Sequence, residues 1–276
     1  MTRSRSKARP KAAPVLASAA LVVLIGAPLD GQVFQSVHSA NLPTTETLQA
    51  GQWLFEISHR FGPPIDDGID ALWGLDGPVN NRLGMAWSPA DGALVGFQRS
   101  NLDDNLELYG KKRLVEGELG GGPLAVAAMG GVAWNTDVFE IDGAEDNEMQ
   151  AYAQLIANVL LADGTVAIGI VPSWIYNPRL RDADAGNAVA IGVNGQWYFT
   201  DSISLLGEWI FSEQIQDAEN DSGTFGMGIE TRGHSFKLVV TNQTRLQPTQ
   251  ILGGSASPFD LDQLRLGFNI TRLLPF

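Results

Sequence analysis

The chain ends in the stretch Leu264-Arg265-Leu266-Gly267-Phe268-Asn269-Ile270-Thr271-Arg272-Leu273-Leu274-Pro275-Phe276. Apolar side chains occupy every second position from Leu264 to Ile270 and return at Leu274 and Phe276. A period of two predicts a β-strand with one apolar and one polar face. A soluble β-sandwich can end in such a strand. An aromatic last residue is more typical of bacterial outer-membrane barrels, whose assembly machinery reads the terminal strand. We therefore expect a barrel, with Phe276 as its assembly signal.

The N-terminus predicts export. Five basic residues between Arg3 and Lys11 precede an apolar run from Val15 to Ala27. This run is shorter than the roughly 20 residues that a transmembrane helix needs, so it is typical of a signal peptide. We expect cleavage near Gly31, a periplasmic N-terminal segment over 32–50 and a barrel over 51–276.

The charge balance limits the partners. Residues 1–31 hold five of the 18 bases and one of the 31 acids, so the mature chain carries 13 bases against 30 acids. This excess of acid argues against nucleic acid as a partner. The chain has no cysteine, which excludes disulfides, thiolate chemistry and a lipoprotein anchor. No cofactor is indicated.

Twelve segments of the mature chain show the alternation of strands. Most are 9–13 residues long, whereas a tilted transmembrane strand needs about 9–11. The segment 105–115 is the weakest, because Gly110-Lys111-Lys112-Arg113 also suits a loop or helix. The predicted strands are 51–60, 82–88, 93–99, 105–115, 124–136, 150–161, 165–176, 188–200, 202–212, 223–232, 235–243 and 262–272.

The links between these segments alternate in length. Short links fall at 89–92, 116–123, 162–164, 200–201 and 233–234, and longer ones at 61–81, 137–149, 177–187, 213–222 and 244–261, with 100–104 intermediate. Short periplasmic turns that alternate with longer outer loops are typical of an outer-membrane barrel. We therefore expect an all-β, antiparallel, up-and-down transmembrane barrel of about 12 strands in the bacterial outer membrane, in contact with lipid and lipopolysaccharide.

The predicted outer loops are acidic. Together they carry 19 acids and three bases, Arg179, Arg181 and Arg245. One interpretation is that the acids keep the exposed loops solvated. The alternative is a functional one, in which they bind divalent cations or attract a cationic solute. The segment Asp142–Glu148 lacks EF-hand spacing, so no dedicated metal site is expected.

The predicted polar faces contain charges of both signs, which belong in the lumen because charge facing lipid costs about 2–4 kcal/mol. Either paired charges hold a closed barrel together, or they line a narrow polar pore. The candidate lumen cluster is Glu56, Arg60, Arg82, Glu107, Lys111, Arg113, Glu208, Glu230, Arg232 and Arg265.

Four motifs lie between residues 38 and 100. They are Leu42-Pro43-Thr44, Phe55-Glu56-Ile57-Ser58-His59-Arg60-Phe61-Gly62, Gly74-Leu75-Asp76 and Asn81-Arg82-Leu83-Gly84. This region resembles a bacterial β-barrel family catalogued as a domain of unknown function and frequent in Bacteroidetes. The resemblance implies a secreted barrel of about this size, and it brings no substrate or catalytic residues.

The second motif can be read physically. Alternation places the odd-numbered residues from Trp53 to Phe61 on the lipid side and Glu56, Ser58 and Arg60 in the lumen. Glu56 and Arg60 are too far apart to pair along the strand, and Arg82 on the next strand is a candidate partner.

An enzyme is not expected. Only three histidines exist, His38, His59 and His234, and they fall in different parts of the predicted barrel. His59 with Asp66, Asp67 or Asp70 is the only candidate acid–base group. We therefore expect a narrow pore or transporter for small polar, in particular cationic, solutes. The alternatives are a closed structural or partner-binding barrel and, more distantly, a surface hydrolase.

Overall fold

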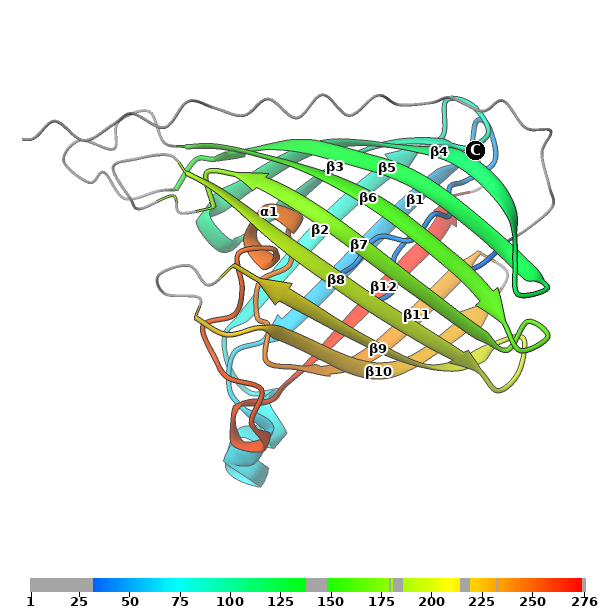
Figure 1. Ribbon diagram of the computed structural model, residues 1–276. Helices are drawn as coiled ribbons and strands as arrows, with labels where there is room; N and C mark the ends of the chain where they lie inside the picture. Colours follow the sequence, from blue (N-terminus) through cyan, green and yellow to red (C-terminus); the bar gives the residue numbers. More distant parts are fainter. Residues whose placement is uncertain are drawn as a thin grey trace, which may run out of the picture.

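The computed structural model describes residues 32–137, 148–178, 180, 186–213, 219–231 and 233–274, which form a closed barrel of twelve antiparallel strands (Figure 1). Each strand pairs with its neighbours in the chain, and β1 pairs with β12 to complete the ring. The strands are β1 (Trp53–Phe61), β2 (Val79–Trp87), β3 (Ala93–Ser100), β4 (Asn105–Leu119), β5 (Gly122–Asn135), β6 (Met149–Leu161), β7 (Val166–Tyr176), β8 (Asn187–Tyr198), β9 (Ile203–Ser212), β10 (Ser222–Thr231), β11 (His234–Thr241) and β12 (Arg265–Leu274). The predicted fold class is confirmed.

The alternation in the sequence becomes an alternation of burial. In β1 the even-numbered residues from Leu54 to Arg60 are buried, while the odd-numbered ones face outward. All twelve predicted segments coincide with strands to within a few residues. The weakest of them, 105–115, forms part of β4, which continues to Leu119 after a bulge between Arg113 and Val115. The link predicted at 116–123 is therefore mostly strand, and Gly120 and Gly121 make the turn with positive φ angles.

The barrel has two unlike ends. The short links β2–β3, β4–β5, β6–β7, β8–β9 and β10–β11 lie at one end, here called the turn end, together with the start of β1 and the finish of β12. The longer links lie at the other, here called the loop end. This is the parity that the sequence predicts.

Aromatic rings follow the outer surface near both ends. At the turn end Trp53 stacks on Trp87, with ring centroids 6.0 Å apart. At the loop end Phe259 packs against Trp209 and Phe225 at 5.1 and 5.7 Å. Between these bands the outward side chains are large and apolar, as expected of a surface that faces lipid.

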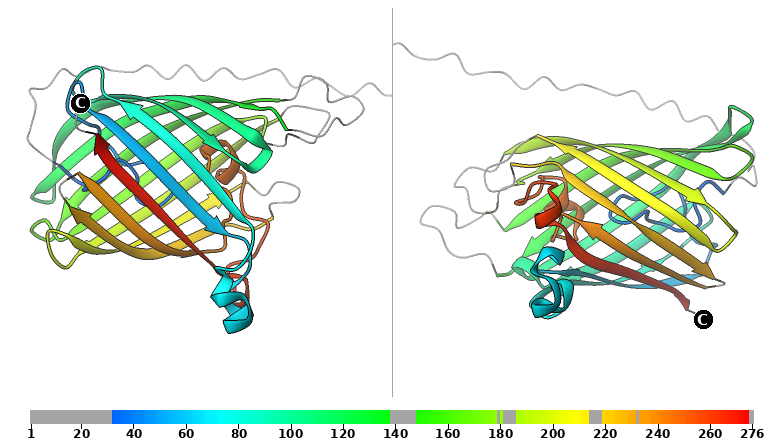
Figure 2. Two further views of the ribbon diagram at one scale, coloured as in Figure 1. Left: turned by 180° about the vertical axis from the view of Figure 1, so that it is seen from behind. Right: turned by 90° about the horizontal axis from the view of Figure 1, so that it is seen from below.

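Residues 33–46 lie inside the barrel, although the sequence led us to expect a separate periplasmic segment over 32–50 (Figure 2). Phe34, Ala40 and Leu42 are fully buried. Both arms of this segment, here called the lumenal hairpin, start at the turn end. The Gln35 side chain donates to the Asp201 backbone beside the β8–β9 turn. On the other arm, the Ala50 N–H donates to Asp91 in the β2–β3 turn.

The link between β11 and β12 also turns inward, although we expected an outer loop over 244–261. Residues 246–255 are buried and include the short helix α1 (Pro248–Ile251), which lies within the barrel near the loop end (Figure 1). Gln247 and Gln250 form a capping box at its start. We call residues 242–255 the inward loop.

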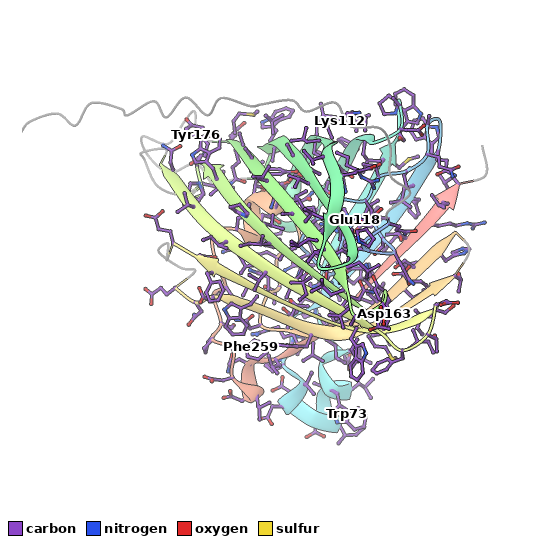
Figure 3. The ribbon with its side chains drawn as sticks, turned by 45° about the vertical axis from the view of Figure 1, so that its right-hand side comes forward. Trp73, Lys112, Glu118, Asp163, Tyr176 and Phe259 are labelled. Carbon is purple, nitrogen blue, oxygen red and sulfur yellow. The ribbon has the colours of Figure 1, made fainter. Side chains whose placement is uncertain are left out.

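A second feature of the loop end projects away from the barrel. The segment η1 (Ile65–Gly74) carries Trp73 at its far tip (Figure 3). It packs against η3 (Leu261–Gln263) and the start of β12; the short η2 (Leu102–Asp104) lies between β3 and β4. The Ile65 N–H donates to the Leu264 carbonyl, and Leu264 is buried, although it opens the apolar row of the terminal strand that would face lipid in a membrane barrel. Within the described ranges, no helix has the length and apolar character to cross a membrane.

The predicted signal peptide, residues 1–31, and the predicted assembly signal Phe276 lie outside the described residues.

Candidate functional site in the lumen

The lumenal hairpin has the backbone pattern of a tight β-hairpin. His38 and Pro43 form an antiparallel bridge, and the Thr44 N–H donates to the Val37 carbonyl at 3.1 Å. The Ser39 N–H donates to the Leu42 carbonyl at 2.9 Å, which closes the turn. The turn points away from the turn end, so its tip lies deep in the lumen.

The tip of the hairpin is held by Glu208 of β9. The backbone N–H groups of Ala40, Asn41 and Leu42 all donate to this carboxylate, at 2.6 to 3.0 Å. The Asn41 side chain adds a longer bond at 3.2 Å. Charge-assisted bonds of this kind are about twice as strong as neutral ones, so Glu208 makes a strong contact with the hairpin tip.

Two buried lysines bind the carbonyl oxygens of the same hairpin. The Lys111 ammonium donates to Val37 at 3.1 Å and to Thr44 at 3.0 Å. The Lys237 ammonium donates to the Ser36 hydroxyl at 2.5 Å and to the His38 carbonyl. The two lysines come from β4 and β11, which are separated by four strands around the barrel. The hairpin is therefore gripped from two sides.

Arg60 connects the hairpin to the barrel wall. Its guanidinium donates to Asn41 Oδ1 at 2.7 Å and to Asn269 Oδ1 at 2.8 Å. Asn269 on β12 in turn donates to the Ala40 carbonyl. Arg60 is fully buried, and its partners are amides rather than the carboxylate of Glu56.

Arg82 connects the inward loop to the same wall. Its guanidinium pairs with Glu56 and donates to the Leu246 carbonyl at 2.6 Å. Ser58 also donates to Glu56, at 2.9 Å. The structure therefore places Glu56, Arg60 and Arg82 on adjacent strands at the level where the hairpin and the inward loop meet.

Glu46 lies on the second arm of the hairpin. It binds the first residues of the hairpin and also the barrel wall. It accepts from the N–H groups of Val33 and Phe34 at 2.9 and 3.3 Å, and it pairs with Arg113 at 2.9 Å. Arg113 also pairs with Glu116 at 2.7 Å. Burial raises the pKa of Glu46, while Arg113 acts in the opposite direction.

His38 is the one histidine that the structure places in the lumen. Its Nδ1 lies 3.6 Å from Glu56 Oε2, and burial lowers its pKa to about 3 despite that carboxylate. His59 faces outward and packs on Phe268 at 4.6 Å, and His234 stacks on Phe236 at the turn end. The three histidines therefore have separate surroundings.

The remaining candidates are more scattered. Glu107 accepts from Gln98 at 2.7 Å and from Tyr152 at 2.8 Å, and Glu230 accepts from Ser235 at 2.8 Å. Arg265 does not belong to the cluster, because it donates to the backbone of Gly62 and Gln263 at the loop end. Arg232 lies outside the described residues.

The hairpin itself is the part of the site that the sequence analysis missed. Its residues were assigned to a segment outside the barrel, even though Leu42-Pro43-Thr44 is one of the motifs that carry the family resemblance. Within the described ranges, no group of three or more His, Asp or Glu side chains is placed to hold a metal ion.

Comparison with known proteins agrees with this fold. The model of a family described as a membrane bound beta barrel domain (DUF5777) matches residues 34–274, so the chain belongs to that family. The match begins within the lumenal hairpin. No curated protein matches the chain.

Three solved barrels resemble it at low sequence identity. The NanC porin is 7% identical with a TM-score of 0.49, covering 79% of this chain and 97% of the porin. The translocator domain of autotransporter NalP from Neisseria meningitidis is 9% identical with a TM-score of 0.41, and the match covers 84% and 91% of the two chains. Outer membrane phospholipase A from Escherichia coli is 10% identical with a TM-score of 0.39, and the match covers 82% and 92%.

Proposed function

We propose that this protein is an outer-membrane passage for small polar solutes, which its own lumenal hairpin closes and which opens when the hairpin leaves. The supporting observation is that residues 33–46 occupy the lumen without belonging to the wall. The β1–β12 ladder runs from Trp53–Leu274 to Arg60–Gly267 and closes the barrel independently of the hairpin.

The topology permits withdrawal. Both arms of the hairpin begin at the turn end, so it can leave there as a unit without threading a free chain end through the barrel. The inward loop differs, since β11 and β12 hold its two ends and Arg82 binds it to the wall. In this proposal the hairpin is the removable closure and the inward loop is a fixed constriction.

The acids of the loop end support a preference for cations at that mouth. Asp66, Asp67, Asp70 and Asp76 lie on the projecting η1 region, and Glu213, Glu219 and Asp221 on the β9–β10 link. Carboxylates at a mouth raise the local concentration of cations, and salt screens the effect. The preference would appear as a reversal potential in a salt gradient that fades as salt rises.

The experiment is single-channel recording of the mature protein in planar bilayers. Because the chain has no cysteine, Thr45→Cys and Asn158→Cys can be introduced as a unique pair; the Thr45 N–H lies 2.6 Å from the Asn158 side chain. We expect current from a variant that lacks residues 33–46. We expect none from the oxidised double-cysteine variant, and current again after reduction.

The alternative is a closed structural barrel, and the apolar contacts of the hairpin favour it. Val37 and Leu42 lie in a continuous apolar cluster with the wall. If neither the deletion variant nor the reduced double-cysteine variant conducts while both are folded, the barrel is closed and the proposed passage is wrong.

A further inference from the structure

One third of the barrel wall has no ionisable side chain apart from tyrosines. The strands β5, β6, β7 and β8 contain no Asp, Glu, Lys, Arg or His at any position. Their lumen side is apolar at many positions, and the polar residues there are neutral amides and hydroxyls. The buried apolar residues include Ala127, Met129, Ile156, Val171, Ile175 and Ala190. We call these four strands the charge-free arc.

This apolar lumen surface is unusual for a passage that carries only polar solutes. Inward positions of a water-filled membrane barrel are expected to be polar, because apolar residues are needed only on the lipid face. In the structure Val37 and Leu42 of the hairpin and Ile251 and Leu252 of the inward loop join one apolar cluster with residues of the arc and of other strands, and Leu42 lies against Gly192 of β8. Withdrawal of the hairpin would uncover part of this surface.

Two buried cations outside this arc, Lys111 on the adjacent β4 and Lys237 on β11, lack carboxylate partners. Among the described residues, no carboxylate lies within ion-pair distance of Lys111 or Lys237. Both ammonium groups are buried, and oxygen atoms of the hairpin satisfy them. A buried ammonium without such oxygens is costly, so removal of the hairpin leaves two positions that favour a replacement acceptor.

Apart from its tip, whose N–H groups bind Glu208, the hairpin thus presents an apolar body to the charge-free arc and oxygen acceptors to the two lysines. We infer that the opened lumen binds an amphipathic solute with an apolar body and a carboxylate or similar oxygen-bearing head. This inference rests on the proposed function, and it concerns the deep lumen rather than the acidic mouth.

The test is block of the ion current through the variant that lacks residues 33–46. The probes are hexanoate, acetate and hexylammonium, which separate the contributions of the apolar body and of the head group. We expect hexanoate to block at concentrations at least tenfold lower than either of the other two. Apolar burial distinguishes it from acetate, and the sign of the head group distinguishes it from hexylammonium.

Variants locate the site. Lys111→Gln combined with Lys237→Gln should weaken the block by hexanoate at least tenfold. Lys112→Gln is the matched control, because Lys112 follows Lys111 in β4 but lies exposed on the outer surface (Figure 3). Ile175→Ser should weaken the block by hexanoate and leave that by acetate unchanged.

The outcomes separate the two proposals. If the variant conducts but hexanoate does not block it at lower concentrations than the other two probes, the inference is wrong and the proposed passage is unaffected. Absence of current in every folded variant would overturn the passage itself. Equal block by hexanoate and hexylammonium would show that only the apolar arc contributes and that the role given to the lysines is wrong.

Discussion

The two parts of the barrel wall fill the lumen in different ways. The charge-free arc, β5 to β8, meets the hairpin and the inward loop through apolar contacts and neutral hydrogen bonds, such as that of the Thr45 N–H to Asn158. The other eight strands, here called the charged arc, also contribute apolar side chains, but they add ionised ones: Glu208, Arg60, Lys111 and Lys237 bind the hairpin, and Arg82 binds the inward loop. The hairpin and the inward loop are therefore amphipathic, and so is the lumen side of the wall that surrounds them.

The difference has an energetic consequence. Apolar contacts are non-directional and scale with buried area, so they hold a segment without fixing its exact position. A buried charge is tolerated only with well-placed partners, so it fixes the position of whatever satisfies it. The charged arc should determine where the hairpin sits, and the charge-free arc should supply much of the affinity.

A charge placed in the charge-free arc should have the largest effect. Ile156 is fully buried in β6, and Ile156→Lys would leave an ammonium without a carboxylate in that arc. We expect a loss of more than about 4 kcal/mol in the free energy of unfolding, enough to prevent assembly. Heat-modifiable gel mobility and guanidinium unfolding in detergent would measure it.

The control for this change is Ile156→Val, which keeps the apolar character and should cost about 1 kcal/mol. If the lysine variant unfolded at the same midpoint as the valine variant, the charge-free arc would tolerate a charge. The proposed difference between the two arcs would then be wrong.

Removing a partner within the charged arc should have the next largest effect. Arg82→Ala would leave Glu56 buried without its ion pair and would free the inward loop at Leu246. Breaking a buried pair from one side costs about 3–5 kcal/mol. Guanidinium unfolding in detergent would measure this loss as well.

Arg99→Ala provides the matched control. Arg99 pairs with Asp104 where the two side chains are 48% and 36% exposed, whereas those of Arg82 and Glu56 are 2% and 7% exposed. An exposed pair contributes about 0–1 kcal/mol. Similar losses in the two variants would show that burial does not set the strength of these pairs.

The sequence predicted the wall of the barrel far better than its contents. Alternation such as Phe55-Glu56-Ile57-Ser58 is a local pattern, and the contrast between lipid and lumen makes it strong, so strand positions and inward charges follow from it. The hairpin depends on contacts between distant parts of the chain. Ala40 binds Glu208 across 168 positions, and no local period reveals such a contact.

One signal in the sequence could have identified the inward loop. Residues 246–255 contain no charged side chain, whereas the other long links are acidic. A long link without charge is suited to burial, because it brings no charge that must be paired. Pro248 at the start of α1 and Gly254 with a φ of 107° then allow the chain to enter and leave a short helix inside the barrel.

Neutralising the contact at the hairpin tip should have a smaller effect than either earlier change. Glu208→Gln keeps the shape of the side chain but replaces charge-assisted bonds with neutral ones and adds an amide donor that faces three N–H groups. We expect the hairpin to be held less tightly by about 1–3 kcal/mol, with the barrel still assembled.

Labelling would detect this loosening. With Ser39→Cys as the only thiol of the chain, the reaction with a maleimide should be at least fivefold faster in the Glu208→Gln background than with Glu208 present. Glu230→Gln, which affects a carboxylate held by Ser235, is the control and should leave the rate unchanged. Equal rates with and without the Glu208→Gln change would mean that the tip is fixed by the apolar contacts alone.

The smallest effect should come from acidification acting on His38. Its pKa falls from 6.5 to about 3 when it is buried in the lumen, because burial outweighs the attraction of Glu56. The released hairpin therefore takes up a proton below about pH 6.5 while the docked hairpin does not, so docking weakens as the pH falls from 6.5 toward 3. At pH 5.5 the loss should be about 1.4 kcal/mol.

Comparison with His38→Asn isolates the histidine from Glu46, which has the opposite tendency because its raised pKa lets the docked form take up a proton first. Glu46 is present in both proteins, so its contribution cancels. On acidification from pH 7.5 to 5.5, the ratio of the maleimide rate with His38 present to the rate in the His38→Asn variant should rise, with both rates measured in the Ser39→Cys background and corrected for thiol ionisation with a free peptide. Parallel pH profiles in the two proteins would rule out His38 as the source of the change and assign it to the carboxylates of the charged arc.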